Sequence, residues 1–159
     1  MRVEEVMTKD VSVCGPGTNA AVAAEIMWKR DCGSLPVLED SGRLVGMVTD
    51  RDLFMALGTQ NRNASDLPVG DIMHCEPSAC APEDDLRNAL KTMAQQRVRR
   101  LPVLDKSGSL KGILSLNDVV LQANGAFKDD VIRTLKAVCG HQFRKGPQQE
   151  LPESKTATA

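Results

Sequence analysis

The tetrapeptide Leu35-Pro36-Val37-Leu38 occurs a second time in this chain, 66 residues later, as Leu101-Pro102-Val103-Leu104. A shift of 66 residues aligns residues 3–57 with 69–123 without a gap, and sixteen of these 55 positions are identical. Unrelated residues of average composition would agree at about one position in sixteen. The chain is therefore a tandem duplication. Because a unit of about 60 residues buries a poor core alone, we expect the two copies to pack on each other.

Both copies predict the same order of elements: strand, helix, strand, strand, helix. Thr18 and Asp84 occupy equivalent positions before apolar residues at helical spacing, and both are good N-caps. Thr49 and Ser115 stand in the same way before the second helix of each copy. The remaining elements are an extended run at 11–13 or 77–79 and two strands joined by a Ser-Gly turn, at 35–38 with 44–48 and at 101–104 with 110–114. The expected fold class is α/β (α+β).

The chain divides into four predicted segments. A polar linker runs from Gly58 to Pro68 and separates the two copies. After the second copy, the sequence from Phe127 to Cys139 predicts one more amphipathic helix. The polar end of the chain is expected to be disordered. The predicted boundaries are repeat 1 at 1–62, repeat 2 at 63–125, a C-terminal helix at 126–141 and a disordered tail at 142–159.

The composition limits the classes of function. The 21 acidic residues outnumber the 20 basic residues, and the net charge of −1 gives no support for a basic face that binds nucleic acid. No apolar run approaches the roughly 18 residues that cross a bilayer, so we expect no membrane association. The five cysteines are an odd number without paired spacing, which suits a reducing cytoplasm.

Two motifs in register carry a resemblance to a known family. The first comprises Leu35-Pro36-Val37-Leu38, Gly42 and Leu44-Val45-Gly46-Met47-Val48-Thr49-Asp50-Arg51-Asp52-Leu53. The second comprises Arg99-Arg100-Leu101-Pro102-Val103-Leu104-Asp105 and Gly112-Ile113-Leu114-Ser115-Leu116-Asn117-Asp118. Over about residues 1–125, the chain resembles a tandem pair of cystathionine-β-synthase (CBS) domains of the stand-alone bacterial type. The resemblance implies two β-α-β-β-α repeats packed with pseudo-twofold symmetry, and two clefts between them that often bind adenosine-containing ligands.

The resemblance assigns a ligand role to one aspartate and one hydroxyl residue in each copy. Asp52 and Asp118 are expected to bind ribose, and Thr49 and Ser115 to bind phosphate or ribose oxygens. Each hydroxyl stands three residues before its aspartate, and positions i and i+3 share one face of a helix. The hydroxyls also stand at helix N-termini, where N–H groups and the helix dipole favour phosphate. The alternative is that all four residues are only helix caps and first-turn acids.

An adenine ring needs an apolar slot and backbone groups for its polar edge. Proline holds the backbone extended, so the strands around the two prolines can supply both. The residues expected to form this slot are Ser12, Val13, Leu35, Pro36, Val37, Leu101, Pro102 and Val103.

The copies differ most directly before the second Leu-Pro-Val. Arg97-Val98-Arg99-Arg100 stands there, whereas the first copy has Asp31-Cys32-Gly33-Ser34. Arginine binds phosphate oxygens in a bidentate manner. We therefore expect Arg99 and Arg100 to bind phosphate and to make the two clefts unequal, with Arg51 as a further candidate. The alternative is that these arginines pair with acidic groups on a partner surface.

The expected function is a regulatory one that senses an adenine nucleotide of the AMP, ADP or ATP class, with NAD and S-adenosylmethionine as further candidates. No obligatory cofactor is expected. No group of residues supplies a nucleophile, a base and an oxyanion site together, so no catalytic residue is assigned. The histidines and cysteines lack the Cys-x2-Cys spacing of a structural metal site, so no metal is expected.

The resemblance also implies a homodimer that pairs through its helices, and an effector protein that receives the signal. The apolar surface expected to form the dimer comprises Ala21, Val22, Ile26, Trp28, Phe54 and Leu57. The alternative function is a ligand-free structural or interaction module that acts through dimerisation.

Overall fold

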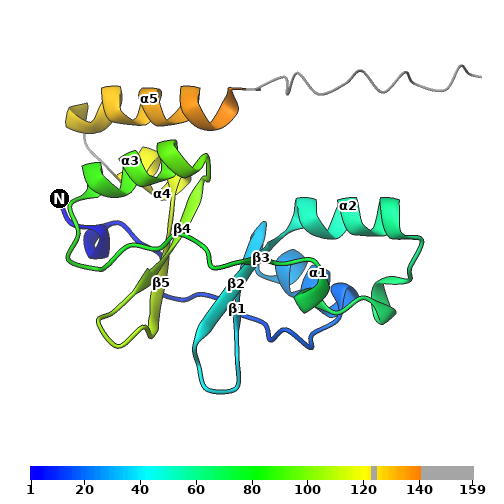
Figure 1. The fold of residues 1–159 in the computed structure, drawn as a ribbon. Helices are drawn as coiled ribbons and strands as arrows, with labels where there is room; N and C mark the ends of the chain where they lie inside the picture. The colour runs from blue at the N-terminus through cyan, green and yellow to red at the C-terminus, as the bar shows by residue number, and fades with distance from the viewer. Residues whose placement is uncertain (123–124, 141–159) are drawn as a thin grey trace, which may run out of the picture.

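The computed structural model describes residues 1–122 and 125–140 and forms two α+β units that lie side by side (Figure 1). The first unit contains α1 (Ala20–Lys29), β1 (Ser34–Leu38), β2 (Leu44–Thr49) and α2 (Asp50–Gln60). The second contains α3 (Leu86–Gln96), β4 (Arg100–Leu104), β5 (Leu110–Ser115) and α4 (Leu116–Gln122), followed by α5 (Lys128–Cys139). The strand β3 (His74–Cys75) and the short 3-10 helices η1 (Val3–Glu5), η2 (Ala64–Asp66), η3 (Val69–Asp71) and η4 (Gly125–Phe127) complete the chain. The predicted tail at 142–159 lies outside the described residues.

Each unit is centred on the predicted β-hairpin. Leu35 pairs with Val48 in the first unit and Leu101 with Leu114 in the second, both in antiparallel register. Gly42 and Gly108 sit in the two turns with a φ of +81°. This is a backbone conformation that glycine adopts without steric cost. The repeat therefore predicted both hairpins and their turns correctly.

The expected first strand of each copy is reduced to a single bridge. Cys14 pairs in parallel with Val37: its N–H donates to the Pro36 carbonyl at 3.1 Å, and its carbonyl accepts from the Leu38 N–H at 2.9 Å. Extending this ladder in either direction would need an N–H from Pro36 or Pro16, and proline has none. The second copy repeats the arrangement with Cys80, Pro82, Pro102 and Val103. The strands predicted at 11–13 and 77–79 are therefore absent.

The first helix of each unit is capped one residue later than predicted. Asn19 caps α1 and Asp85 caps α3. The predicted caps serve the preceding turns instead, because the Thr18 hydroxyl accepts from the Gly15 N–H at 3.1 Å and the Asp84 carboxylate accepts from the Ala81 N–H at 2.8 Å. The predicted linker also begins too early, since α2 continues through Gly58 to Gln60.

The two hydrophobic cores are built from exchanged segments, which are residues 1–8 and their repeat equivalents 67–74. Val3 and Val6 are buried in the core of the second unit, and Leu67 and Val69 are buried in the core of the first. Figure 1 shows the N-terminus lying beside α3. The spatial units therefore differ from the sequence repeats predicted at 1–62 and 63–125, and those boundaries stay a prediction.

Equivalent backbone hydrogen bonds hold both exchanged segments. The Val3 N–H donates to the Asp84 carbonyl at 3.0 Å, and the Val69 N–H donates to the Thr18 carbonyl at 2.7 Å. These pairs are related by the 66-residue shift, so the structure repeats the pseudo-twofold relation that the sequence predicts.

Glycine is required where each exchanged segment crosses a hairpin. A Cβ at Gly112 would lie 2.6 Å from the Thr8 carbonyl oxygen, and a Cβ at Gly46 would lie 2.6 Å from the Met73 sulfur and 2.9 Å from the His74 carbonyl oxygen. Two of these neighbours are backbone atoms, which cannot move aside without shifting the segment.

The predicted C-terminal helix forms as α5, which packs on α3. Phe127 is buried in the core of the second unit, and the buried Thr134 hydroxyl donates to the Leu90 carbonyl of α3 at 3.2 Å. Arg87 of α3 bonds the Asp130 carboxylate at 3.1 Å and lies over the Phe127 ring. Among residues 1–122 and 125–140, no helix is long and apolar enough to cross a membrane.

Replacing Gly112 by alanine should lower the free energy of unfolding by about 1–3 kcal/mol, because the new methyl group pushes the first exchanged segment away. Gly58→Ala is the control, since nothing lies within 4 Å of its Cβ position. That change should stabilise α2 by up to about 1 kcal/mol through helix propensity. Urea denaturation measures both variants, and equal stability of the two would contradict the proposed close approach.

Candidate functional site

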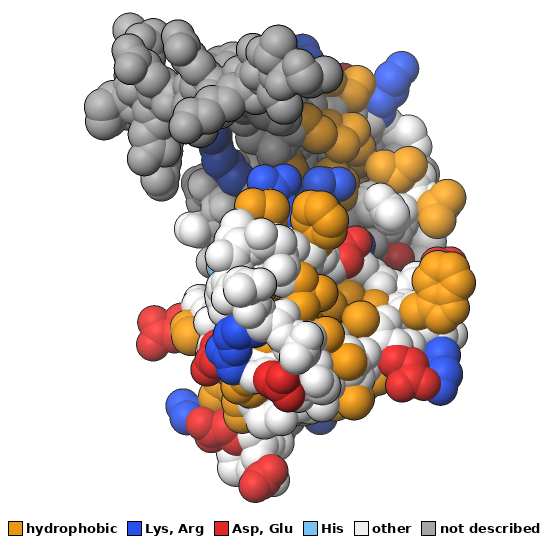
Figure 2. Space-filling model, turned by 90° about the vertical axis from the view of Figure 1, so that its right-hand side faces the viewer, with side chains coloured by type: hydrophobic (Ala, Val, Ile, Leu, Met, Phe, Trp, Pro, Cys, Tyr) orange, Lys and Arg blue, Asp and Glu red, His pale blue; other side chains and the backbone are white. Residues whose placement is uncertain are grey.

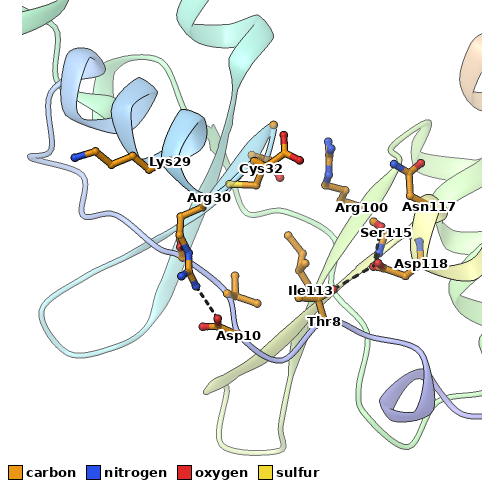
Figure 3. Close-up of a pocket in the computed structure, with 15 residues that line it drawn as sticks. Thr8, Asp10, Lys29, Arg30, Cys32, Arg100, Ile113, Ser115, Asn117 and Asp118 are labelled. Atoms are coloured by element: carbon orange, nitrogen blue, oxygen red, sulfur yellow. Dashed lines mark hydrogen bonds and ion pairs between the residues drawn. The ribbon is translucent and has the colours of Figure 1, made fainter. Parts of the chain in front are cut away.

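A cleft of about 640 Å³ opens between the two units (Figure 3). One wall comes from β4, β5 and the start of α4, and the opposite wall comes from the end of α1 and the loop before β1. Thr8 and Asp10 of the N-terminal chain lie at its base. A molecule bound in this cleft would touch both repeats.

Ser115 and Asp118 lie in this cleft and form a reciprocal cap at the start of α4. The Ser115 N–H and hydroxyl donate to Oδ2 of Asp118 at 2.9 and 2.7 Å, and the Asp118 N–H donates to the Ser115 hydroxyl at 3.1 Å. These bonds engage only Oδ2. The other carboxylate oxygen, Oδ1, faces Thr8, whose hydroxyl lies 3.4 Å away at the limit of a hydrogen bond. The pair is thus a helix cap that still presents one acceptor to the cleft.

Arg100 brings a positive charge into the same cleft. It begins β4 and pairs with Ser115 across the hairpin, which places it next to the capped aspartate. A Cβ at Gly33 would lie 3.4 Å from Nη2 of Arg100 and 3.1 Å from Oδ2 of Asp50, so the glycine keeps this region open. Among the ion pairs of the described residues, none involves Arg100.

The opposite wall holds two further cations that are already compensated. The Arg30 guanidinium bonds the Asp10 carboxylate at 2.7 Å and the Ser12 hydroxyl at 2.9 Å. Lys29 forms an ion pair with Glu25 one helical turn earlier. Sequence reasoning missed both cations, because the second copy has glutamine at the equivalent positions and so offers no repeated signal.

Thr49 and Asp52 form the same cap in the first unit. The Thr49 N–H and hydroxyl donate to Oδ2 of Asp52 at 2.8 and 2.7 Å. Here Oδ1 has a different partner, because it lies 2.9 Å from Nε2 of His74. Arg51 is exposed beside this cap and does not line the cleft.

Of the other predicted ligand residues, some line the cleft and others do not. Ser12 lines the cleft, whereas Val13 and the exposed Arg99 do not. The six residues of the two Leu-Pro-Val motifs are buried and do not line the cleft: Leu35, Pro36, Val37, Leu101, Pro102 and Val103. Their strands are buried on both faces, so the predicted apolar slot for adenine does not form part of this cleft.

The cysteines fall into two classes. Burial raises the pKa of the Cys14 thiol to about 11 and, together with the nearby Asp84 carboxylate, raises the pKa of the Cys80 thiol to about 12. Cys32 lines the cleft and Cys75 is exposed on β3. Within the described part of the chain, no cluster of three or more histidine, cysteine or acidic side chains could hold a metal ion.

Comparison with known proteins identifies the repeated unit. The family model for the CBS domain matches residues 3–59 and again residues 69–124. The chain belongs to the CBS domain family. Both matches span a hairpin together with the capped aspartate that follows it, so the cleft lies between two CBS domains.

Several CBS proteins are similar over most of this chain. The CBS domain-containing protein YhcV of Bacillus subtilis is 35% identical over 119 residues, which cover 75% of this chain and 83% of YhcV. Inosine-5'-monophosphate dehydrogenase of Methanocaldococcus jannaschii is 32% identical over 91% of this chain but only 29% of that enzyme. The crystal structure of CBSX2 in complex with AMP, a protein of Arabidopsis thaliana, matches with a TM-score of 0.66 and 33% identity over 77% of this chain and 95% of CBSX2.

At pH 8, iodoacetamide should modify Cys32 and Cys75 well before Cys14 and Cys80. Alkylation needs the thiolate, and a raised pKa lowers the thiolate fraction of the two buried thiols at this pH. Mass spectrometry of tryptic peptides over time measures the order. Early modification of Cys14 or Cys80 in folded protein would show that these thiols are not buried.

Proposed function

We propose that the chain is a non-catalytic sensor of an adenosine phosphate, which binds in the cleft beside Asp118. One observation carries this proposal: a single cleft combines a carboxylate that keeps one oxygen outside its helix cap with a guanidinium that has no ion-pair partner among the described residues. A carboxylate can accept both hydroxyls of a ribose diol. A guanidinium is suited to phosphate oxygens.

The charges of the cleft favour one phosphate group over three. Arg30 is paired with Asp10 and Lys29 with Glu25, which leaves Arg100 as the cation without an ion pair among the described cleft residues. The cleft lining also includes Asp31 and Asp118, whose negative charges disfavour additional phosphate groups. We therefore propose AMP as the preferred ligand within the adenine class, ahead of ADP, ATP, NAD and S-adenosylmethionine. The AMP complex of CBSX2, which shares 33% identity, supports this choice.

The position of the cleft suggests how binding becomes a signal. A ligand that contacts both units favours the arrangement in which the two walls are correctly spaced, and it shifts the population toward that arrangement. We propose that an effector protein or a second copy of the chain responds to the shift in the cytoplasm.

AMP should raise the melting temperature of the wild-type protein by several degrees, since a ligand at 100 times its dissociation constant adds about 2.7 kcal/mol. Asp118→Asn should weaken AMP by about ten- to a hundredfold through loss of charged hydrogen bonds, which are worth about 1.5–3 kcal/mol. Asp52→Asn alters the same cap in the first unit and is the matched comparison for stability. Calorimetric titration measures both. No binding of any adenine ligand by the wild type would instead favour the ligand-free interaction module.

Arg100→Ala should weaken AMP far more than adenosine, because only AMP carries the phosphate that the guanidinium binds. Arg99→Ala is the matched variant, since Arg99 is the neighbouring arginine outside the cleft. Arg99→Ala should leave the affinities for AMP and for adenosine within about twofold of the wild-type values, as expected of an exposed side chain without ligand contact. Equal losses for AMP and adenosine in Arg100→Ala would refute the phosphate role.

We also propose that the homodimer forms through α1 and α2. Trp28 and Phe54 are 87% and 74% exposed, and Val22 and Leu57 are also exposed on these helices. Ala21 is exposed and Ile26 is half-buried. Figure 2 shows hydrophobic side chains gathered on the side of the molecule that carries these helices. Large exposed apolar side chains gathered on one side of a protein are typical of interfaces.

The double variant Trp28→Glu/Phe54→Glu should convert the dimer into a monomer, because four charges would have to be buried across the interface. Ile132→Glu is the control, since Ile132 is exposed on α5, away from the proposed interface. Light scattering coupled to size-exclusion chromatography measures the mass of each. An unchanged dimer mass in the double variant would exclude this face.

A further inference from the structure

The two repeats place different residues against their capped aspartates. Thr8 and His74 are equivalent under the 66-residue shift, and each ends an exchanged segment. The Thr8 hydroxyl lies 3.4 Å from Oδ1 of Asp118, and Nε2 of His74 lies 2.9 Å from Oδ1 of Asp52. The same position in the fold therefore carries a small hydroxyl in one repeat and an imidazole ring in the other.

The imidazole changes what Asp52 can offer a ligand. Oδ2 already accepts from the Thr49 N–H and hydroxyl, and Oδ1 is engaged by His74. The Asp52 side chain is only 15% exposed. Asp118 differs, because a hydroxyl at 3.4 Å is a weak and easily displaced partner.

The backbone keeps His74 at this position. His74 belongs to β3 and pairs with Met47 of β2 in the same sheet that leads into the Thr49 cap. The His74 backbone also passes close to Gly46 of β2, since a Cβ at Gly46 would lie 2.9 Å from the His74 carbonyl oxygen. The ring can rotate about its own side-chain bonds, but its Cα stays next to Asp52.

The loops before β1 and β4 add to the difference between the two clefts. The open cleft is lined by Cys32 and Gly33, and the equivalent residues of the second copy are Val98 and Arg99. Larger side chains thus stand where the counterpart of the open cleft would need space.

We propose that His74 closes the cleft at Asp52, so that each chain carries one nucleotide site, at Asp118. This inference rests on the proposed function and adds the number of sites and the residue that determines it. His74 is the residue that contacts the Asp52 carboxylate, and the larger loop residues Val98 and Arg99 add to the closure.

The test exchanges the two residues between the repeats. Calorimetric titration with AMP should give one site per chain for the wild type and two for His74→Thr, with the second site weaker than the first because Ser34 is the repeat equivalent of Arg100. Thr8→His should weaken binding at Asp118 by about tenfold or more, because the ring then competes for Oδ1. Circular dichroism and melting temperature check that each variant is folded; the His74 side chain is 72% exposed, so its replacement does not disturb a core.

The outcomes separate this inference from the proposed function. Two sites in the wild type, or one site in both the wild type and His74→Thr, would overturn the role of His74 while leaving nucleotide binding intact. One site in His74→Thr with none in the wild type would support the role of His74 and refute the site at Asp118. No binding in either protein would overturn both. As an independent readout, the His74 ring signals in the NMR spectrum should not shift on adding AMP to the wild type, and a saturable shift would contradict a closed cleft.

Discussion

The exchange of the segments 1–8 and 67–74 is the constraint on which the rest of the structure depends. Each core takes buried side chains from the other repeat's sequence, so neither repeat can complete its core alone. The exchange is possible only because Gly46 and Gly112 let backbone pass within van der Waals distance of a hairpin. The first segment also leads directly into the cleft, where Thr8 and Asp10 lie at the base.

The cap and the proposed ligand acceptor are the same carboxylate, which uses a different oxygen for each role. Bonds to Oδ2 hold the side chains of Asp52 and Asp118 in place without a ligand. An acceptor that is already ordered loses little side-chain entropy on binding. The two interpretations drawn from the sequence, cap and ligand group, are therefore compatible for Asp118, and the geometry shows how one side chain can serve both purposes.

The hairpins, the caps at Thr49 and Ser115 and the helix after the repeats could be predicted because each depends on residues close in sequence. The exchange could not, since it joins Val3 to Asp84 and Val69 to Thr18 across the duplication. The predicted first strands are absent because four prolines lack the N–H groups that would extend the ladder. The apolar residues beside these prolines still give the sequence pattern of a strand. The Leu-Pro-Val residues were predicted to form the adenine slot because proline holds the backbone extended, so that the strand can offer apolar side chains and backbone groups together. Strands buried on both faces give the same sequence pattern.

Because the two repeats are duplicates, each difference between them can be identified by comparing equivalent positions. A motif that stabilises a helix is useful in both repeats, so the presence of Thr49 and Asp52 in the first copy needs no ligand to explain it. What differs is the residue that contacts Oδ1, and this residue belongs to a segment that the other repeat's sequence supplies to the same core. If His74 closes the cleft at Asp52 as proposed, the number of motifs exceeds the number of sites. The informative comparison is between the two residues that contact Oδ1 of the capped aspartates. These residues are a threonine at Asp118 and a histidine at Asp52.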